Sequence, residues 1–271
     1  MRHSALLLVC SLGIALHCLL PFLWFVLTSL KLPAELAAIP PKLIPSIYWG
    51  FYQSALEKYL LLHYVANSVI VAGTATLITV TIGSLAAYAM ARFHLPWMRF
   101  YLLLLLTVSM FPQIAIAGPV WSILDRFHWL NSYQGLVSIY VALSLPLGIW
   151  ILTTFFRDVP GEIEEAALVD GCSRLQALCK VILPLAAPGI LTAALLVFIY
   201  TWNEFFFALI IMTDPNVQTL PVGIALFPGE YTMPWGEIAA ASTIATVPLV
   251  VLTLVFQRGI ARGLSAGAVK G

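Results

Sequence analysis

Glu165-Ala166-Ala167-Leu168-Val169-Asp170-Gly171 is a polar stretch with long apolar stretches on both sides of it. Four carboxylates stand within nine residues at this point of the chain, namely Glu162, Glu164, Glu165 and Asp170. The whole chain of 271 residues has twelve Asp and Glu, so a third of its acidic side chains lie in one short segment. Such a segment must face water, and we expect its acidic side chains to face a partner as well.

The composition of the chain is that of a membrane protein. Hydrophobic residues make up 61% of it, charged residues make up 9%, and the mean hydropathy is +0.98. Soluble domains carry about 25% charged residues, and a soluble core could not bury so much apolar surface. The sequence therefore predicts an all-α integral membrane protein whose solvent is the lipid bilayer. The formal net charge of +1 gives no reason to expect nucleic acid as a partner.

The sequence contains none of the patterns that we associate with a catalytic or metal-binding protein. Its four cysteines have no metal-ligand spacing, and it has no H-E-x-x-H motif, His-rich set or paired nucleophile and base. A G-x-x-x-x-G-K-[ST] phosphate loop is also missing. We therefore expect no enzyme, no metal site and no cofactor on this chain. Any ATP and Mg would be bound by a partner.

Six stretches are apolar over the roughly 20 residues that a membrane-spanning helix needs. They are 5–30, 66–91, 98–123, 133–156, 186–212 and 238–260. The first is too long for a signal peptide and lacks an A-x-A-like cleavage site, so we expect it to be retained. The three longer intervals between the spans are polar or rich in proline, and we expect a loop of turns in the last of them. These intervals are 31–65, 157–185 and 213–237.

The positions of Lys and Arg give the expected orientation. With the N-terminus in the cytoplasm, six spans place nine Lys and Arg in cytoplasmic segments and four outside. This asymmetry predicts that both termini and the acidic segment are cytoplasmic. Adding or removing one span would break the agreement, so six spans are better supported than five or seven.

The acidic segment has the pattern of two short helices joined at a glycine. Its glutamates crowd the first turns of a predicted helix over 161–170, where the helix dipole favours negative charge. Gly171 permits the left-handed conformation that ends helices, and Ser173 suits the N-cap of a second helix. In this elbow, Ala166 and Ala167 would let another protein approach closely. A merely solvated loop, with the carboxylates as helix caps, explains these residues equally well.

The spacing within and after the elbow resembles the signature of one family. Glu165-Ala166-Ala167-x-x-Asp170-Gly171, followed after ten residues by Ile182-Leu183-Pro184, resembles the EAA signature of ABC importer permeases. More narrowly, the chain resembles the carbohydrate-uptake subfamily, in particular the second membrane subunit of maltose- and trehalose-type systems. Further stretches agree with it along nearly the whole chain: Asn67-Ser68, Tyr200-Thr201-Trp202-Asn203-Glu204-Phe205 and the terminal segment 263–271.

The resemblance implies a type I ABC importer permease fold in which the elbow is the coupling helix. In that family this helix docks in a groove on a cytoplasmic ATP-hydrolysing subunit and passes the closure of that subunit to the spans. The residues that match the signature here are Glu165, Ala166, Ala167, Asp170 and Gly171, and Glu164 beside them is a further candidate for coupling to the ATPase subunit. The implied division is a first helix with an extracytoplasmic segment (1–61), a permease domain (62–262, coupling loop 157–185) and a cytoplasmic tail (263–271).

The resemblance also implies partners, location and cargo. The partners are a homologous second permease, two copies of the ATPase subunit, and an extracytoplasmic sugar-binding protein that contacts the 213–237 loop. The location is the inner or plasma membrane of a bacterium or archaeon. The cargo is a di- or oligosaccharide such as maltose or trehalose, taken up by ATP-driven alternating access.

A second polar group lies deep in the fifth apolar stretch, at Asn203 and Glu204. A charge at the bilayer centre costs about 2.5–3.5 kcal/mol on insertion scales, so Glu204 should face a bundle interior or a water-filled cavity. With Tyr200 and Trp202 these residues offer the ring faces and hydrogen-bonding groups that a sugar needs. The four residues are candidates for the translocation pathway. Alternatively, Asn203 and Glu204 bond to another helix and hold the bundle together.

Two other functions stay open at this point. The substrate could be another polyol, such as glycerol 3-phosphate or a glycoside. The protein could instead be an ion-coupled secondary carrier, with Glu204 as the ion-coupling site.

Overall fold

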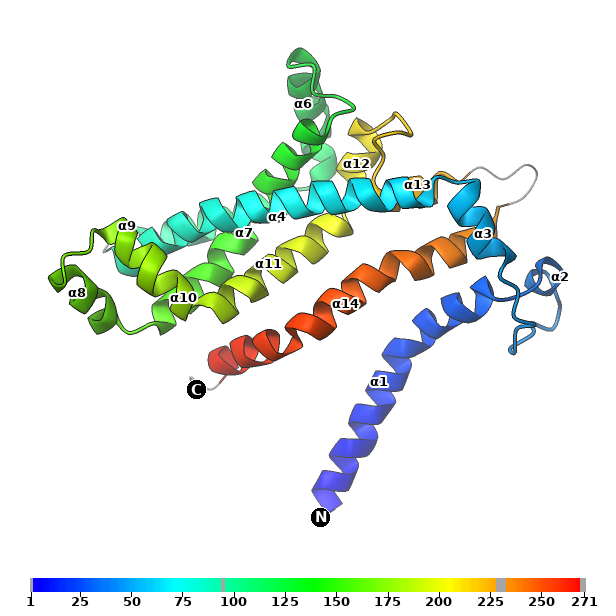
Figure 1. The fold of residues 1–271 in the computed structure, drawn as a ribbon, viewed down its shortest axis with the longest axis horizontal. Helices are drawn as coiled ribbons and strands as arrows, with labels where there is room; N and C mark the ends of the chain where they lie inside the picture. The colour runs from blue at the N-terminus through cyan, green and yellow to red at the C-terminus, as the bar shows by residue number, and fades with distance from the viewer. Residues whose placement is uncertain (1, 94–95, 228–232, 269–271) are drawn as a thin grey trace. The chain divides into compact units, whose positions relative to one another are not determined.

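The computed structural model describes residues 2–93, 96–227 and 233–268. Over these ranges the ordered elements are all helices, and no strand occurs (Figure 1). This confirms the all-α prediction. The chain divides into two compact units, one within 1–65 and 220–249 and the other within 66–219 and 250–271.

Four described helices are long and apolar enough to cross a membrane. They are α1 (Arg2–Ser29), α4 (Leu61–Arg92), α7 (Tyr133–Asp158) and α14 (Trp235–Ala268). Two further pairs pass the same test together but are sharply bent: Phe100–Ser109 with Gln113–Arg126, at 86°, and Arg174–Leu185 with Ala187–Trp202, at 81°. The described residues thus provide four candidate spans, or up to six if each bent pair is one span.

The third predicted span, 98–123, is two helices rather than one continuous helix. The structure has α5 (Met98–Ser109) and α6 (Gln113–Arg126), with Pro112 in an extended conformation as the N-cap of α6. Proline has no backbone N–H to donate, and it disfavours helical geometry in the residue before it. The break between the two helices therefore falls at this proline.

The fifth predicted span, 186–212, is also interrupted. Helix α11 (Ala187–Trp202) ends at Asn203, and a separate α12 (Phe206–Ile211) follows. The side chain of Asn203 donates to the carbonyl of Ile199 at 2.7 Å. Polar side chains that bond locally to the backbone compete with the helix ladder in this way.

The first unit contains α1, α2 (Pro33–Leu36), α3 (Gly50–Glu57), α13 (Leu220–Ala225) and the first part of α14. Within it the ring of Tyr59 stacks on Phe227, with 4.3 Å between centroids. The hydroxyls of Ser29 and Tyr52 lie 2.8 Å apart. The presence of α13 corrects the expected loop of turns over 213–237, of which 228–232 lie outside the described residues.

The core of the second unit joins α4, α7, α11 and the segment after the elbow glycine. Its buried members include Tyr88 of α4, Phe156 of α7 and Ile182 of the π-helical turn Leu178–Ile182. Thr79 and Ser144 add a buried hydroxyl pair at 2.8 Å between α4 and α7. The acidic elbow packs against this core. Of the predicted tail, 263–268 continue α14 and 269–271 lie outside the described residues.

Candidate functional site

The acidic segment forms the predicted elbow. Helix α8 (Gly161–Val169) is capped by Asp170 and followed by Gly171, whose φ of 89° lies in the left-handed region. The N–H of Gly171 donates to the carbonyl of Leu168 at 3.1 Å, and that of Cys172 donates to Ala167 at 3.0 Å. This pair of bonds is the Schellman motif, which satisfies carbonyls that the helix end would leave free.

The second half of the elbow begins with a capping box. The Ser173 hydroxyl accepts from the N–H of Gln176 at 3.3 Å, and the Gln176 side chain accepts from the N–H of Ser173 at 2.9 Å. This box starts α9 (Arg174–Ala177), and the chain continues through the π-helical turn to α10 (Leu183–Leu185). The helix–glycine–helix prediction is therefore confirmed in its geometry.

Helix α8 has one face turned into its own chain and one turned away from it. Glu164 and Ala167, three residues apart, are 5% and 7% exposed. Glu165 and Ala166 are exposed, and Val169 is 88% exposed. Asp170 and Gly171 at the end of the helix are exposed too. Four of the six predicted coupling residues thus lie at the surface, while Glu164 and Ala167 do not.

Glu164 lies inside the protein, which differs from the expected contact with a partner. Its Oε1 accepts a hydrogen bond from the Tyr88 hydroxyl at 2.5 Å, and its Oε2 lies 2.9 Å from Nε of Arg92. A second guanidinium nitrogen of Arg92 donates to the carbonyl of Val159 at 2.8 Å. A buried carboxylate needs such partners, because burial without them is costly.

Tyr88 and Arg92 were not among the predicted site residues. They are four residues apart on α4, so they project from the same side of that helix. An arginine and a tyrosine at this spacing near the end of an apolar helix were the available signal. Nothing in the local sequence, however, indicated that their partner lay on α8.

Glu204 is 7% exposed and caps a helix within the chain. It accepts from the Tyr140 hydroxyl at 2.8 Å, and from the backbone N–H groups of Phe207 at 3.0 Å and Ala208 at 3.2 Å. Free N–H groups at a helix start attract such an acceptor. The placement favours the structural interpretation of Glu204, which holds α12 at the break and joins it to α7.

The four candidate pathway residues are placed differently from one another. Tyr200, Asn203 and Glu204 line an open hollow of about 520 Å³, together with Phe205 and residues of α6 and α12. Trp202 is 3% exposed and stacks on Phe198, so it belongs to the core. The described structure therefore brings three of the four together and separates Trp202 from them.

Asn67, near the start of α4, fixes a loop of the second unit. Its amide nitrogen donates to the carbonyls of Asn216 at 3.1 Å and Gln218 at 2.8 Å, and its oxygen accepts from the Tyr133 hydroxyl at 2.7 Å. From the other side, Asn131 accepts from the N–H of Asp214 at 2.9 Å. The segment 213–219 is thus held at the starts of both α4 and α7. Within the described ranges, no three His, Cys, Asp or Glu form a metal-binding group.

Comparison with known proteins places the elbow in a family context. A family model described as the binding-protein-dependent transport system inner membrane component matches residues 79–266, which include α8, Gly171 and Glu204. The chain belongs to this family. It is therefore a multi-pass membrane permease, and the resemblance inferred from the elbow signature is confirmed.

Relatives of this permease carry names of sugar transporters. It is 43% identical to the trehalose/maltose transport system permease protein MalG of Thermococcus litoralis, over 98% of this chain and 96% of that protein. It is 40% identical to the sulfoquinovosyl glycerol permease SmoH of Agrobacterium fabrum, with 93% and 89% covered. Identity to the trehalose permease SugB of Mycobacterium tuberculosis is also 40%, with 94% and 93% covered.

The fold of the permease also has a solved counterpart. A chain from the crystal structure of a bacterial ABC transporter involved in importing the acidic polysaccharide alginate superposes with a TM-score of 0.78. The alignment covers 95% of this permease and 96% of that chain at 21% identity. This similarity supports the type I importer fold and carries no information on the substrate of this permease.

Proposed function

We propose that this chain is the permease subunit of a binding-protein-dependent ABC importer that takes up a di- or oligosaccharide such as trehalose or maltose. The observation that carries the proposal is its similarity to the Thermococcus litoralis trehalose/maltose permease, at 43% identity over 98% of the chain. The transport cycle would be ATP-driven alternating access. ATP and Mg would be bound by the partner ATPase, and this chain would catalyse no reaction.

A glycoside is the second candidate substrate. The relative from Agrobacterium fabrum is named for sulfoquinovosyl glycerol and is 40% identical over 93% of the chain. Uptake assays with the cognate binding protein and with trehalose, maltose and a glycosyl glycerol would separate the candidates.

The elbow would be the point at which the ATPase acts. Its exposed face offers Glu165 and Asp170 for polar contacts, and Ala166 and Val169 for close apolar packing. Its other face is anchored through Glu164 to α4. A displacement of α8 by the ATPase would therefore be passed directly to a membrane helix. In this proposal Glu164 and Ala167 position the elbow, and Gly171 sets its angle.

The proposed assembly has this permease beside a homologous second permease, with two ATPase copies and an extracytoplasmic sugar-binding protein. Six spans would put both termini in the cytoplasm, in the membrane of a bacterium or archaeon. The fixed segment 213–219 suits a contact with the binding protein, because its backbone is held by Asn67 and Asn131. Rigid loops lose less entropy on binding than mobile ones.

Within the hollow of about 520 Å³, Tyr200 and Asn203 are the side chains best placed to meet a sugar. Glu204 would serve mainly as the cap of α12, because both of its oxygens already accept hydrogen bonds. No observation favours an ion-coupling role for it. An ion-coupled carrier is therefore not our second candidate.

The test is purification of the chain in mild detergent from its native host, with identification of the subunits that accompany it. We expect an ATPase and a second permease, and ATP-dependent uptake after reconstitution with the binding protein. Uptake that follows an ion gradient and ignores ATP would contradict the proposal.

A further inference from the structure

Lys31 is a buried cation without an acidic partner. It is 4% exposed, yet none of the carboxylates in the described ranges lies within 4.0 Å of its ammonium. The ammonium instead lies 4.3 Å from the centre of the Trp24 ring. Lysine is almost never fully buried unless it is paired, and an aromatic face compensates only part of the lost hydration. Among the described residues, the positive charge of Lys31 is therefore not compensated by a carboxylate.

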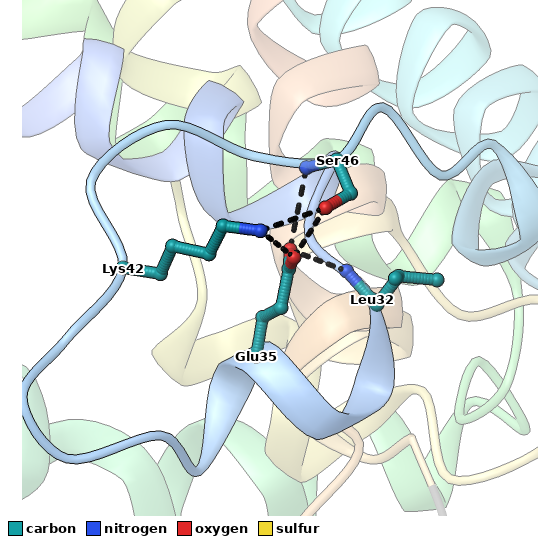
Figure 2. A network of polar contacts seen from close by, with 4 residues as sticks. All are labelled: Leu32, Glu35, Lys42 and Ser46. Carbon is teal, nitrogen blue, oxygen red and sulfur yellow. Dashed lines mark hydrogen bonds and ion pairs between the residues drawn. The ribbon is translucent and has the colours of Figure 1, made fainter.

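The nearest acidic residue on the same segment is already occupied. Both oxygens of Glu35 are taken, by the Lys42 ammonium, by the hydroxyl and N–H of Ser46, and by the N–H of Leu32 (Figure 2). These contacts close the loop between α2 and residue 46 and neutralise the carboxylate. Glu35 therefore cannot also serve as the counter-ion of Lys31.

Lys31 and Glu35 line a hollow of about 340 Å³ within the first unit. The other walls include Trp24 and Thr28 of α1 and Trp235 of α14. The Thr28 hydroxyl oxygen is buried and has no hydrogen-bond partner among the described residues. One unpaired ammonium and one unpaired hydroxyl thus stand at a hollow whose walls are otherwise mainly apolar and aromatic.

The position along the chain indicates where such an anion would come from. Lys31 lies two residues after the end of Leu7–Ser29, an apolar stretch long enough to span a membrane, and Trp235 begins the apolar stretch Trp235–Phe256. Tryptophan and lysine at the ends of spans lie at the level of the lipid headgroups. Lys31 therefore lies at the level where the phosphates of lipid headgroups are available as anions.

We propose that this hollow binds an anionic membrane phospholipid, with the lipid phosphate on Lys31 and Thr28 and the acyl chains along α1. An anionic lipid supplies the single negative charge that Lys31 lacks, whereas a zwitterionic headgroup brings a cation of its own. The Lys31 ammonium and the Thr28 hydroxyl both donate to phosphate oxygens. Trp24 and Trp235 flank the glycerol region.

The experiment titrates the full-length chain in detergent with phosphatidylglycerol, phosphatidylcholine or inorganic phosphate. Lipid adducts are counted by native mass spectrometry, and the unfolding midpoint is recorded. We expect phosphatidylglycerol to bind and to raise the midpoint more than phosphatidylcholine does. A site that serves free phosphate would respond equally to inorganic phosphate alone, and that result would overturn the lipid assignment.

Substitutions locate the site. Lys31→Met should weaken phosphatidylglycerol binding by at least about tenfold, since it removes a charge-assisted hydrogen bond. Lys31→Arg should retain binding, and Thr28→Val should weaken it several-fold. Lys58→Met is the matched control, because Lys58 also lies over an aromatic ring, that of Tyr59, but is exposed. If Lys31→Met does not fold, Thr28→Val provides the same test. An unchanged affinity of Thr28→Val for phosphatidylglycerol would contradict the proposed site.

Discussion

Nε of Arg92 lies 2.9 Å from Oε2 of Glu164, and this ion pair joins the last residue of α4 to α8. Both side chains are nearly buried, at 11% and 6% exposure. A buried pair of this kind resists separation, because either charge left alone would lack compensation. The ion pair therefore fastens the elbow to the end of a candidate membrane span.

Removing one partner of this ion pair should detach the elbow from α4. Glu164→Ala leaves Arg92 buried without its counter-ion, and breaking a buried pair costs about 3–5 kcal/mol. We expect a lower unfolding midpoint in detergent and a loss of ATP-driven uptake. Glu165→Ala, on the exposed face next to it, should leave the midpoint unchanged. Equal midpoints for the two variants would show that the ion pair does not anchor α8.

The angle of the elbow depends on Gly171. An added Cβ would meet no atom within 4 Å, so Gly171→Ala tests the backbone conformation alone. A residue with a side chain at a positive φ costs about 1–2 kcal/mol, and Asn tolerates this region better than Ala. In denaturation experiments, wild type should be the most stable protein, Gly171→Asn the next and Gly171→Ala the least stable. An alanine variant as stable as wild type would contradict the Schellman end of α8.

Glu204 should behave as a structural cap. Glu204→Ala leaves the Tyr140 hydroxyl and two backbone N–H groups without an acceptor, and each unsatisfied buried group costs about 1–3 kcal/mol. Glu204→Gln keeps one oxygen acceptor and should lie between alanine and wild type in stability. We expect uptake by the Gln variant to stay ATP-dependent and insensitive to a proton gradient. A fully stable Gln variant without uptake would instead assign Glu204 to the substrate or to an ion.

The loop closed by Glu35 should be sensitive to acid. The Lys42 ammonium and the Ser46 hydroxyl lower the pKa of Glu35 from 4.5 to about 2. The open loop therefore binds more protons than the closed loop between these values, so closure is most stable above pH 4.5 and weakens as the pH falls toward 2. Amide exchange at Ser46, whose N–H donates to Glu35, should accelerate over this window relative to an exposed amide. In the Glu35→Gln variant, this pH dependence of amide exchange at Ser46 should be absent.

The elbow could be predicted because the hydrogen bonds that form it join residues close together in the sequence. The glycine at the helix end and the Ser173–Gln176 capping box lie within a few residues of the bonds that they make. The partner of Glu164 was not predictable from the same segment, because Tyr88 lies 76 residues away along the chain. The contacts of Glu164 with Tyr88 and Arg92 of α4 appear only in the folded chain, and they decide which glutamate faces inward.

The breaks in the third and fifth predicted spans come from single residues, whose effect on the backbone a mean hydropathy does not register. A window of about 20 residues scores Pro112 and Asn203 as minor interruptions of an apolar run. Their backbone effects decide the outcome instead, since Pro112 cannot donate and Asn203 bonds back to the preceding turn. The polar pair Asn203 and Glu204 was predicted as part of the pathway or as a bond between helices, and in the structure both side chains bond to the backbone around that break.

In the proposed function, the ATPase acts on the exposed face of α8. Co-purification of the ATPase with the Val169→Glu variant tests this contact, because Val169 is 88% exposed and its replacement should not disturb the fold. A carboxylate buried in an apolar contact without a partner is strongly unfavourable. We predict that recovery of the ATPase falls by at least about tenfold, while Leu43→Glu, at a residue 67% exposed in another loop, recovers it fully. Equal recovery with both variants would contradict the account.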